Sequence, residues 1–250
     1  DKPRMAICDS PPWFGKTEQQ VAYDMALKKC SALGWELISI DFASLFKLAS
    51  LLYEGPWVAE RFAAIKDFIK KPNIQMDPVV RGIIQKAEGF SSVDVFEAEY
   101  LRRDLSREIE TAFKGFDAIL VPTTPTFPTI QDLANEPVVE NSRLGTYTNF
   151  VNFMDWSALS FPAGFRSDGL PFGLTLISTQ WEEGKLLDLS RSFLSGKYRP
   201  LGNTRFEFLT PEETPMQKLL TPLAVVGAHL TGLPLNHQLT SIEATLLSKT

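Results

Sequence analysis

The chain has 250 residues, of which 44% are hydrophobic and 22% are charged, and its formal net charge is -5. These values are ordinary for a globular protein with a sizeable core. Mild, scattered acidity excludes the basic stripe that nucleic-acid binding needs, and no apolar run approaches the roughly 20 residues of a membrane span. We therefore expect neither a nucleic-acid nor a membrane partner. No signal segment follows the N-terminus, and the chain does not begin with Met, so we expect it to start inside a longer polypeptide.

The chain contains two cysteines, Cys8 and Cys30. Two are too few for a disulfide framework, and no Cys-x-x-Cys pair is present. We expect two buried free thiols in a reducing compartment, which predicts a cytoplasmic protein.

The first elements are a strand, a helix and a second strand. Residues 4–8 are typical of a short strand, and Thr17 with Gln20 predicts a capping box that opens a helix ending at Gly34. Residues 35–40 predict the second strand. This order favours an α/β fold. The apolar stripe of the helix consists of Ala22, Met25, Ala26 and Cys30.

Two longer helical stretches follow. Residues 41–71 have a helical pattern that Gly55-Pro56 interrupts. Residues 92–114 predict one long helix with Ser92 as its N-cap and Gly115 as its stop. The apolar face of this second helix consists of Val95, Ala98, Leu101, Leu105 and Ile109.

The remainder predicts further strands and a domain boundary. After a buried strand at 118–121, residues 122–142 are rich in Pro, Thr and Asn and predict a long irregular loop. Strands at 160–164 and 173–178, joined near 167–169, precede a last helix at 183–193. We predict one domain over residues 1–197, a linker over 198–218, and the truncated start of a second domain over 219–250, where 219–230 is strand-like.

Common catalytic motifs are absent from the sequence. It has no phosphate-binding glycine loop and no Gly-x-Ser-x-Gly elbow, and its two histidines are His229 and His237. Two histidines without clustered cysteines do not predict a metal site. Composition and spacing alone therefore support no more than a soluble α/β domain.

The Gly55-Pro56 break is the most informative segment. Tyr53 precedes it and Arg61 follows it, so a phenol and a guanidinium flank a gap between two helices. A guanidinium matches a carboxylate through two parallel hydrogen bonds, which would suit an anionic ligand. The alternative is structural: Tyr53 and Trp57 as core aromatics, with Arg61 paired to a surface carboxylate.

Several segments resemble one protein family. They are residues 51–65, 117–123, 141–150, 161–166, 169–173, 223–230 and 232–237. Through them the chain resembles the allophanate hydrolase branch of the amidase-signature family, and Tyr53-Glu54-Gly55-Pro56-Trp57 with Arg61 is specific to that branch. The resemblance implies the second half of an amidase-signature fold, a mixed β-sheet flanked by helices, followed by the start of a small α+β domain.

The resemblance also implies a chemistry. Family members use a serine nucleophile, a bridging serine and a lysine base, within and upstream of a Gly-Gly-Ser-Ser-Gly-type loop. No such loop occurs in the sequence, so we expect these groups upstream and the fragment alone to be inactive. The implied reaction cleaves allophanate to ammonia and N-carboxycarbamate, and then to carbon dioxide, in urea degradation. Arg61 would hold the substrate carboxylate and Tyr53 would orient the substrate.

The resemblance also has implications for the two histidines, for partners and for alternative functions. His229 or His237 would act as acid or base in the second domain, or be structural. We expect no cofactor, a homodimer, and a urea carboxylase that is fused to the chain or works with it. Two alternatives stay open: another amidase of the same fold acting on a lipid or aminoacyl-tRNA amide, and a non-catalytic scaffold that kept the fold.

Overall fold

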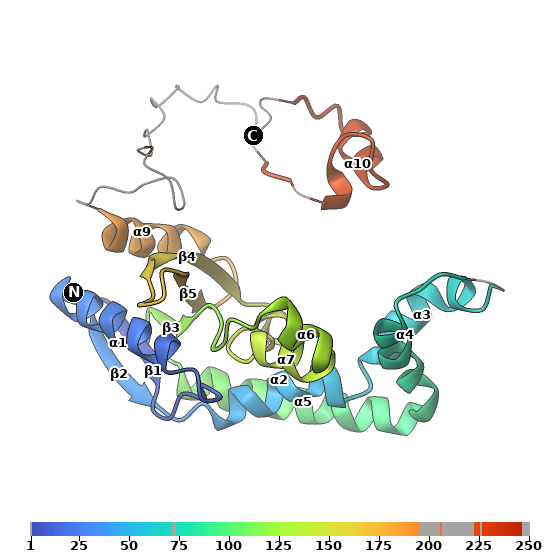
Figure 1. The fold of residues 1–250 in the computed structure, drawn as a ribbon, viewed down its shortest axis with the longest axis horizontal. Coiled ribbons are helices and arrows are strands. Elements are labelled where there is room, and N and C mark those ends of the chain that lie inside the picture. Colours follow the sequence, from blue (N-terminus) through green and yellow to red (C-terminus); the bar gives the residue numbers. More distant parts are fainter. Residues whose placement is uncertain (1, 72–73, 196–205, 207–222, 226, 247–250) are drawn as a thin grey trace. The chain divides into compact units, whose positions relative to one another are not determined.

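The computed structural model describes residues 2–71, 74–195, 206, 223–225 and 227–246. The chain divides into two compact units, Asp1–Lys197 and Tyr198–Thr250. Each unit is described separately below, and Figure 1 shows the elements of both.

The first unit is built on a five-stranded sheet with the order β2-β1-β3-β5-β4. Its strands are β1 (Arg4–Cys8), β2 (Glu36–Ile40), β3 (Ala118–Pro122), β4 (Ser157–Phe165) and β5 (Pro171–Ser178). β1 pairs in parallel with β2 and β3, whereas β5 is antiparallel to β3 and β4. The sheet is therefore mixed, as the family resemblance implied.

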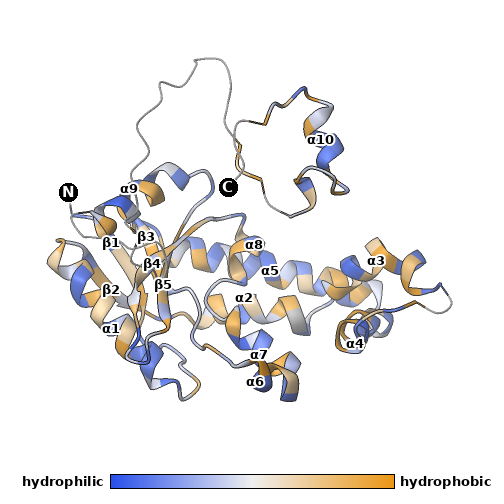
Figure 2. Cartoon of the chain, turned by 45° about the horizontal axis from the view of Figure 1, so that its top comes forward, coloured by the Kyte–Doolittle hydropathy of each residue, from blue (hydrophilic) through white to orange (hydrophobic). Residues whose placement is uncertain are grey.

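Helices cover both faces of this sheet. Side chains alternate between the faces with a period of two, so Met5 and Leu120 lie in one core while Ala6 and Ile119 lie in the other. The first core is closed by α1 (Thr17–Ala32) and α9 (Glu183–Leu194), and the second by α2 (Ala43–Glu54), α5 (Ser92–Ala112) and α8 (Phe150–Met154). Figure 2 shows that these helices carry hydrophobic and hydrophilic bands together, as helices covering a sheet do.

A helical extension lies beyond the ends of α2 and α5, away from the sheet (Figure 1). It consists of α3 (Val58–Ile69), α4 (Pro78–Gln85) and the short 3-10 helix η1 (Lys86–Gly89), which pack against one another. The interruption predicted at Gly55-Pro56 is confirmed, because α2 ends at Glu54 and α3 begins at Val58.

Two predicted caps are wrong. Lys16 is the N-cap of α1 and makes no side-chain cap hydrogen bond, so the Thr17–Gln20 box does not form. Ser91 rather than Ser92 caps α5, because Asp94 and Ser91 form a capping box. Met25 and Val95, predicted on apolar faces, are 64% and 42% exposed; Val95 lies in the first turn of α5, where residues 91–97 are all exposed.

The loop predicted over residues 122–142 is wrong in its second half. That half contains α6 (Ile130–Asn135) and α7 (Pro137–Leu144). Thr129 and Asp132 form a capping box at the start of α6, and Pro137 occupies the first turn of α7, where its missing N–H costs nothing.

The second unit is described only in part. It contains the 3-10 helix η2 (Gly227–His229) and α10 (Asn236–Thr240), joined by a hydrogen bond of 2.9 Å from Leu235 N to Ala228 O. The described residues of the strand-like run 219–230 form no strand; residues 219–222 and 226 lie outside the described part. The predicted linker, residues 198–218, also lies outside it except for Phe206. The predicted domain boundaries stay predictions.

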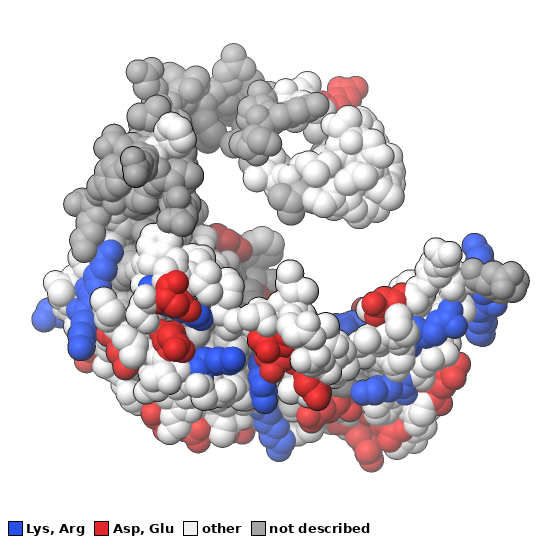
Figure 3. All heavy atoms as spheres, viewed as in Figure 1, with Lys and Arg blue, Asp and Glu red and all other residues white. Residues whose placement is uncertain are grey.

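Both cysteines are buried and free, as predicted. Burial raises the pKa of the Cys8 thiol to about 11 and that of the Cys30 thiol to about 12. Within the described ranges, no helix is long and apolar enough to cross a membrane, and no three His, Cys, Asp or Glu side chains gather as metal ligands would. Figure 3 shows acidic and basic side chains interspersed on the face in view.

Candidate active site

The break between α2 and α3 is fixed by local backbone geometry. Gly55 is extended (φ -90°, ψ 178°), and its N–H donates to Leu51 O at 3.0 Å. A Cβ on Gly55 would lie 2.6 Å from Leu51 O, so only glycine fits without a backbone shift. Pro56 follows and accepts the first bond of the next helix from Ala59 N, at 2.8 Å. Gly55 and Pro56 are both buried, so the break belongs to the packed structure.

Trp57 connects the start of α3 to α8 through a ring contact. Its ring lies edge-to-face with that of Phe153, with centroids 4.7 Å apart and planes at 72°. The next residue, Val58, is 4% exposed. Trp57 itself is half-buried, so it packs at the margin of the interior and not as the fully buried core aromatic of the structural alternative.

The two predicted substrate contacts lie on opposite sides of the break. Tyr53 is in the last turn of α2, and its side chain lies outside the described part of the structure. Arg61 is in the first turn of α3 and is exposed. The Arg61 guanidinium makes no ion pair or hydrogen bond with any residue that the structure describes. The surface carboxylate of the structural alternative is thus not among its described neighbours, and the role of both residues stays a prediction.

A separate pocket of about 380 Å³ opens where β3 ends and β5 begins. It is lined by Gln19, Thr123, Thr124, Phe127, Ser160, Phe161, Pro162, Pro171, Phe172 and Gly173. This lining contains no charged side chain, and neither Tyr53 nor Arg61 belongs to it. The pocket can accept hydrogen-bonding, uncharged groups, but its lining supplies no acid, base or activated nucleophile.

Hydroxyl groups form the polar wall of this pocket. Thr123 Oγ1 lies 2.8 Å from Ser160 Oγ and 3.0 Å from Thr175 Oγ1, which joins β3 to β4 and β5. A Cβ on Gly173 would lie 2.8 Å from Thr123 Oγ1. Glycine at 173 therefore makes room for the threonine. Thr123 and Thr124, which directly follow β3, both line this pocket.

Arg166 contacts the pocket through Gln19, one of its lining residues, and was not predicted as a site residue. Its side chain is 8% exposed and forms a two-pronged ion pair with Asp168. A third nitrogen donates to Gln19 Oε1 at 3.3 Å, and Gln19 Nε2 donates to Thr124 O at 2.8 Å. The hydrogen bond from Arg166 lowers the pKa of Asp168, so the pair stays charged at neutral pH. Asp168 is close in sequence, but Gln19 could not have been found from spacing.

The two histidines belong to the second unit. His237 is exposed, and its Nδ1 lies 2.8 Å from Pro234 O. His229 is half-buried, with Nε2 3.1 Å from Gln238 Oε1. Their assignment as acid or base stays a prediction.

Comparison with known proteins decides the family. The model of the amidase family matches residues 1–187. The chain belongs to the amidase family. It is 42% identical over 258 residues to urea amidolyase of Saccharomyces cerevisiae, in an alignment that covers 98% of this chain and 14% of that protein.

Solved structures of this family share the fold. An allophanate hydrolase of Kluyveromyces lactis is 40% identical with a TM-score of 0.80, covering 99% of this chain and 42% of that one. The K. lactis urea amidolyase is 40% identical with a TM-score of 0.82, covering 99% of this chain and 16% of that one. The amidase-signature fold is therefore confirmed, and the chain spans less than half of each of these relatives.

Proposed function

We propose that the chain is the substrate-binding part of an allophanate hydrolase, acting in urea degradation. The observation that carries the proposal is the α2–α3 break, which sets Tyr53 and Arg61 on either side of a buried Gly55-Pro56. The 40% identity to an allophanate hydrolase over 99% of the chain supports it. The substrate would be a small urea-type amide with one carboxylate.

Arg61 would hold this carboxylate. Its guanidinium is exposed, and no carboxylate among the described residues pairs with it. A guanidinium is permanently charged and presents two parallel donors, which match the two oxygens of a carboxylate. The Tyr53 hydroxyl would accept or donate a further hydrogen bond and so orient the carbamoyl group.

Bond cleavage would follow the mechanism that the resemblance implies. A serine adds to the terminal carbamoyl carbon, a lysine-activated partner takes its proton, and ammonia leaves; water then releases N-carboxycarbamate. Residues 1–250 contain no Gly-Ser-Ser-Gly loop, so the serines and the lysine would come from another part of the protein. His229 or His237 would then assist the loss of carbon dioxide.

The test is Arg61→Lys in the complete enzyme, with ammonia release from allophanate as the readout. Lysine keeps the charge but not the two-pronged geometry, so kcat/KM should fall about 10- to 100-fold, as expected for losing a charged hydrogen bond. The matched control is Arg191→Lys on α9, whose side chain is 76% exposed and which should leave kcat/KM unchanged.

If the Arg61→Lys variant has the same kcat/KM as the wild type, Arg61 does not have the proposed role. A panel of other amides separates the rival substrates: a lipid amide would place an apolar chain beside an unpaired cation, which is unfavourable. An enzyme that releases ammonia from those amides and not from allophanate would support the other amidases of this fold.

We also propose a urea carboxylase as the functional partner and the cytoplasm as the location. The first is supported by two relatives named urea amidolyase, of which this chain spans 14% and 16%. The homodimer stays a prediction.

A further inference from the structure

The start of α3 is connected to the α2–α5–α8 layer through a pair of aromatic rings. Trp57 immediately precedes α3, and its ring meets Phe153 of α8 at a centroid distance of 4.7 Å. Arg61 follows four residues later, which is about one helical turn and about 6 Å along the axis. We call Trp57 and Phe153 the aromatic anchor.

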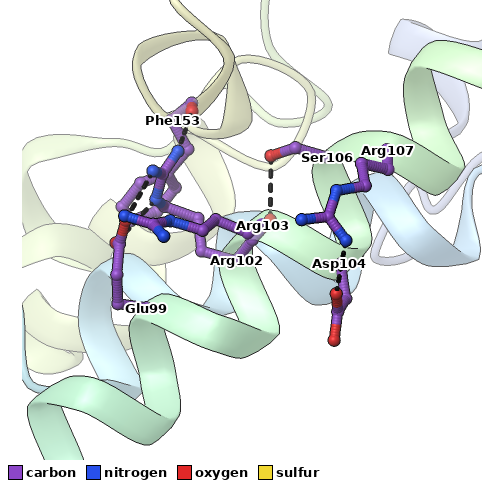
Figure 4. A network of polar contacts seen from close by, with 7 residues as sticks. All are labelled: Glu99, Arg102, Arg103, Asp104, Ser106, Arg107 and Phe153. Atoms are coloured by element: carbon purple, nitrogen blue, oxygen red, sulfur yellow. Dashed lines mark hydrogen bonds and ion pairs between the residues drawn. The ribbon is translucent and has the colours of Figure 1, made fainter.

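The anchor is itself held from α5. Arg102 Nη1 donates to the Phe153 carbonyl oxygen at 3.0 Å. The same guanidinium is clasped by Glu99 through two hydrogen bonds, Nε to Oε2 at 2.8 Å and Nη2 to Oε1 at 2.7 Å. Figure 4 shows Glu99 on one side of Arg102 and the Phe153 carbonyl on the other. Contacts therefore run without interruption from α5 through α8 to the first residue before α3.

The two helices of the break are supported differently. α2 carries Leu45 and Leu48, both 0% exposed, in the core beneath the sheet. α3 packs against α4 and η1 in the extension beyond the sheet (Figure 1). The direction of α3 relative to α2 thus depends on what fixes its first turn, where Trp57 is half-buried against Phe153 and Val58 is 4% exposed.

We propose that Trp57 and Phe153 are positioning residues for substrate binding: the anchor sets the direction of α3 and so holds Arg61 in register with Tyr53. This inference rests on the proposed function. A two-pronged carboxylate contact must be held within about 0.5 Å and 10–20° to work. A small tilt of α3 at its start moves the guanidinium by more than this tolerance, although no atom of the anchor touches the substrate.

The first test compares steady-state kinetics of the complete enzyme with allophanate. Trp57→Leu and Phe153→Leu remove the ring contact and should raise KM about tenfold, while kcat changes less than about threefold, because carboxylate binding is lost and the chemical groups are untouched. Trp57→Phe keeps an aromatic ring and should recover most of the lost affinity. The matched control is Phe68→Leu, a 47% exposed aromatic on the same helix, which should change neither constant.

The second test separates positioning from general weakening of the fold. Because the anchor acts through Arg61, adding Trp57→Leu to Arg61→Gln should cause no further loss in kcat/KM. If the double variant loses kcat/KM by the product of the two single losses, the inference is overturned. It is also overturned if Trp57→Leu and Phe153→Leu both keep the KM of the wild type. In either case the proposed function stands, provided that Arg61→Lys lowers kcat/KM. If the complete enzyme does not hydrolyse allophanate, both the proposed function and the positioning role of the anchor are overturned.

Discussion

Gly55 makes the break between α2 and α3 possible, because a side chain there has no room. The ideal Cβ position lies 2.6 Å from the Leu51 carbonyl oxygen and 3.3 Å from the Trp57 ring, and the first of these neighbours is backbone. Helix α2 would have to shift to admit even a methyl group. The same residue pair, Gly55-Pro56, thus fixes both the end of one helix and the placement of Tyr53 and Arg61.

Gly55→Ala should lower the free energy of unfolding by about 1–3 kcal/mol, the usual cost of overpacking a buried position. Gly82→Ala on α4 is the matched control. No atom lies within 4 Å of its Cβ position, and alanine favours a helix over glycine by about 1 kcal/mol, so this variant should be neutral or stabilised. Urea denaturation measures both, and equal midpoints for the two variants would contradict the steric account.

Two arginines show what the sequence could and could not indicate. Gly55-Pro56 predicts a helix break in any sequence and places Arg61 beside it, but the substrate role of Arg61 comes from the family resemblance and stays a prediction. Arg166 was missed because its environment is assembled from distant segments: Gln19 is 147 positions away. Burial of an arginine side chain to 8% exposure cannot be deduced from its neighbours in sequence.

On the scale of elements, α5 is tied to α8 by the Glu99–Arg102 pair. The hydrogen bond from Arg102 lowers the pKa of Glu99 below its ordinary value, because it favours the charged carboxylate. A lowered folded-state pKa contributes stability that is fully present above the unfolded value, about 4.3, and is lost as pH falls through the folded value.

Glu99→Gln should therefore destabilise the protein at pH 7 by on the order of 1 kcal/mol, since the pair is partly exposed to solvent. The difference from the wild type should be smaller at pH 3 than at pH 7, because the charged carboxylate is lost as pH falls through the folded value. Urea midpoints at both pH values measure it. Asp188→Asn removes an ion pair on α9 whose side chains are 78% and 76% exposed and should show no difference at either pH. A Glu99→Gln deficit that persists undiminished at pH 3 would contradict the linkage.

Most elements were predicted from local signals, and the errors were local as well. The stretch at residues 92–114 became α5 because its apolar residues recur at helical spacing, and residues 118–121 became β3 because a short continuous apolar run is typical of a buried strand. Composition misled over residues 122–142: Pro and Thr suggested a loop, although Thr129 with Asp132 and then Pro137 are themselves start signals for short helices. Ser91 and Ser92 are adjacent serines, and only the Asp94 spacing distinguishes the true cap.

On the scale of the molecule, the strand order could not be read from the chain. A strand, a helix and a strand predicted the parallel β1–β2 pair, but the insertion of β3 between β1 and β5 depends on pairings more than 100 residues apart, such as Met5 with Ala118. The family resemblance supplied the mixed sheet. The pocket bounded by Gln19, Thr123 and Gly173 depends on the same long-range order, so it was not predicted as a unit.

The chain spans 42% of a related allophanate hydrolase, so its activity has to be measured in the complete enzyme. The central claim is that Arg61 recognises the carboxylate of the substrate. The most direct measurement is the ratio of kcat/KM for allophanate to that for biuret, which carries a neutral amide in place of the carboxylate. Replacing Arg61 by Gln should lower this ratio about 10- to 100-fold, almost entirely through allophanate. A ratio equal to that of the wild type would contradict the claim.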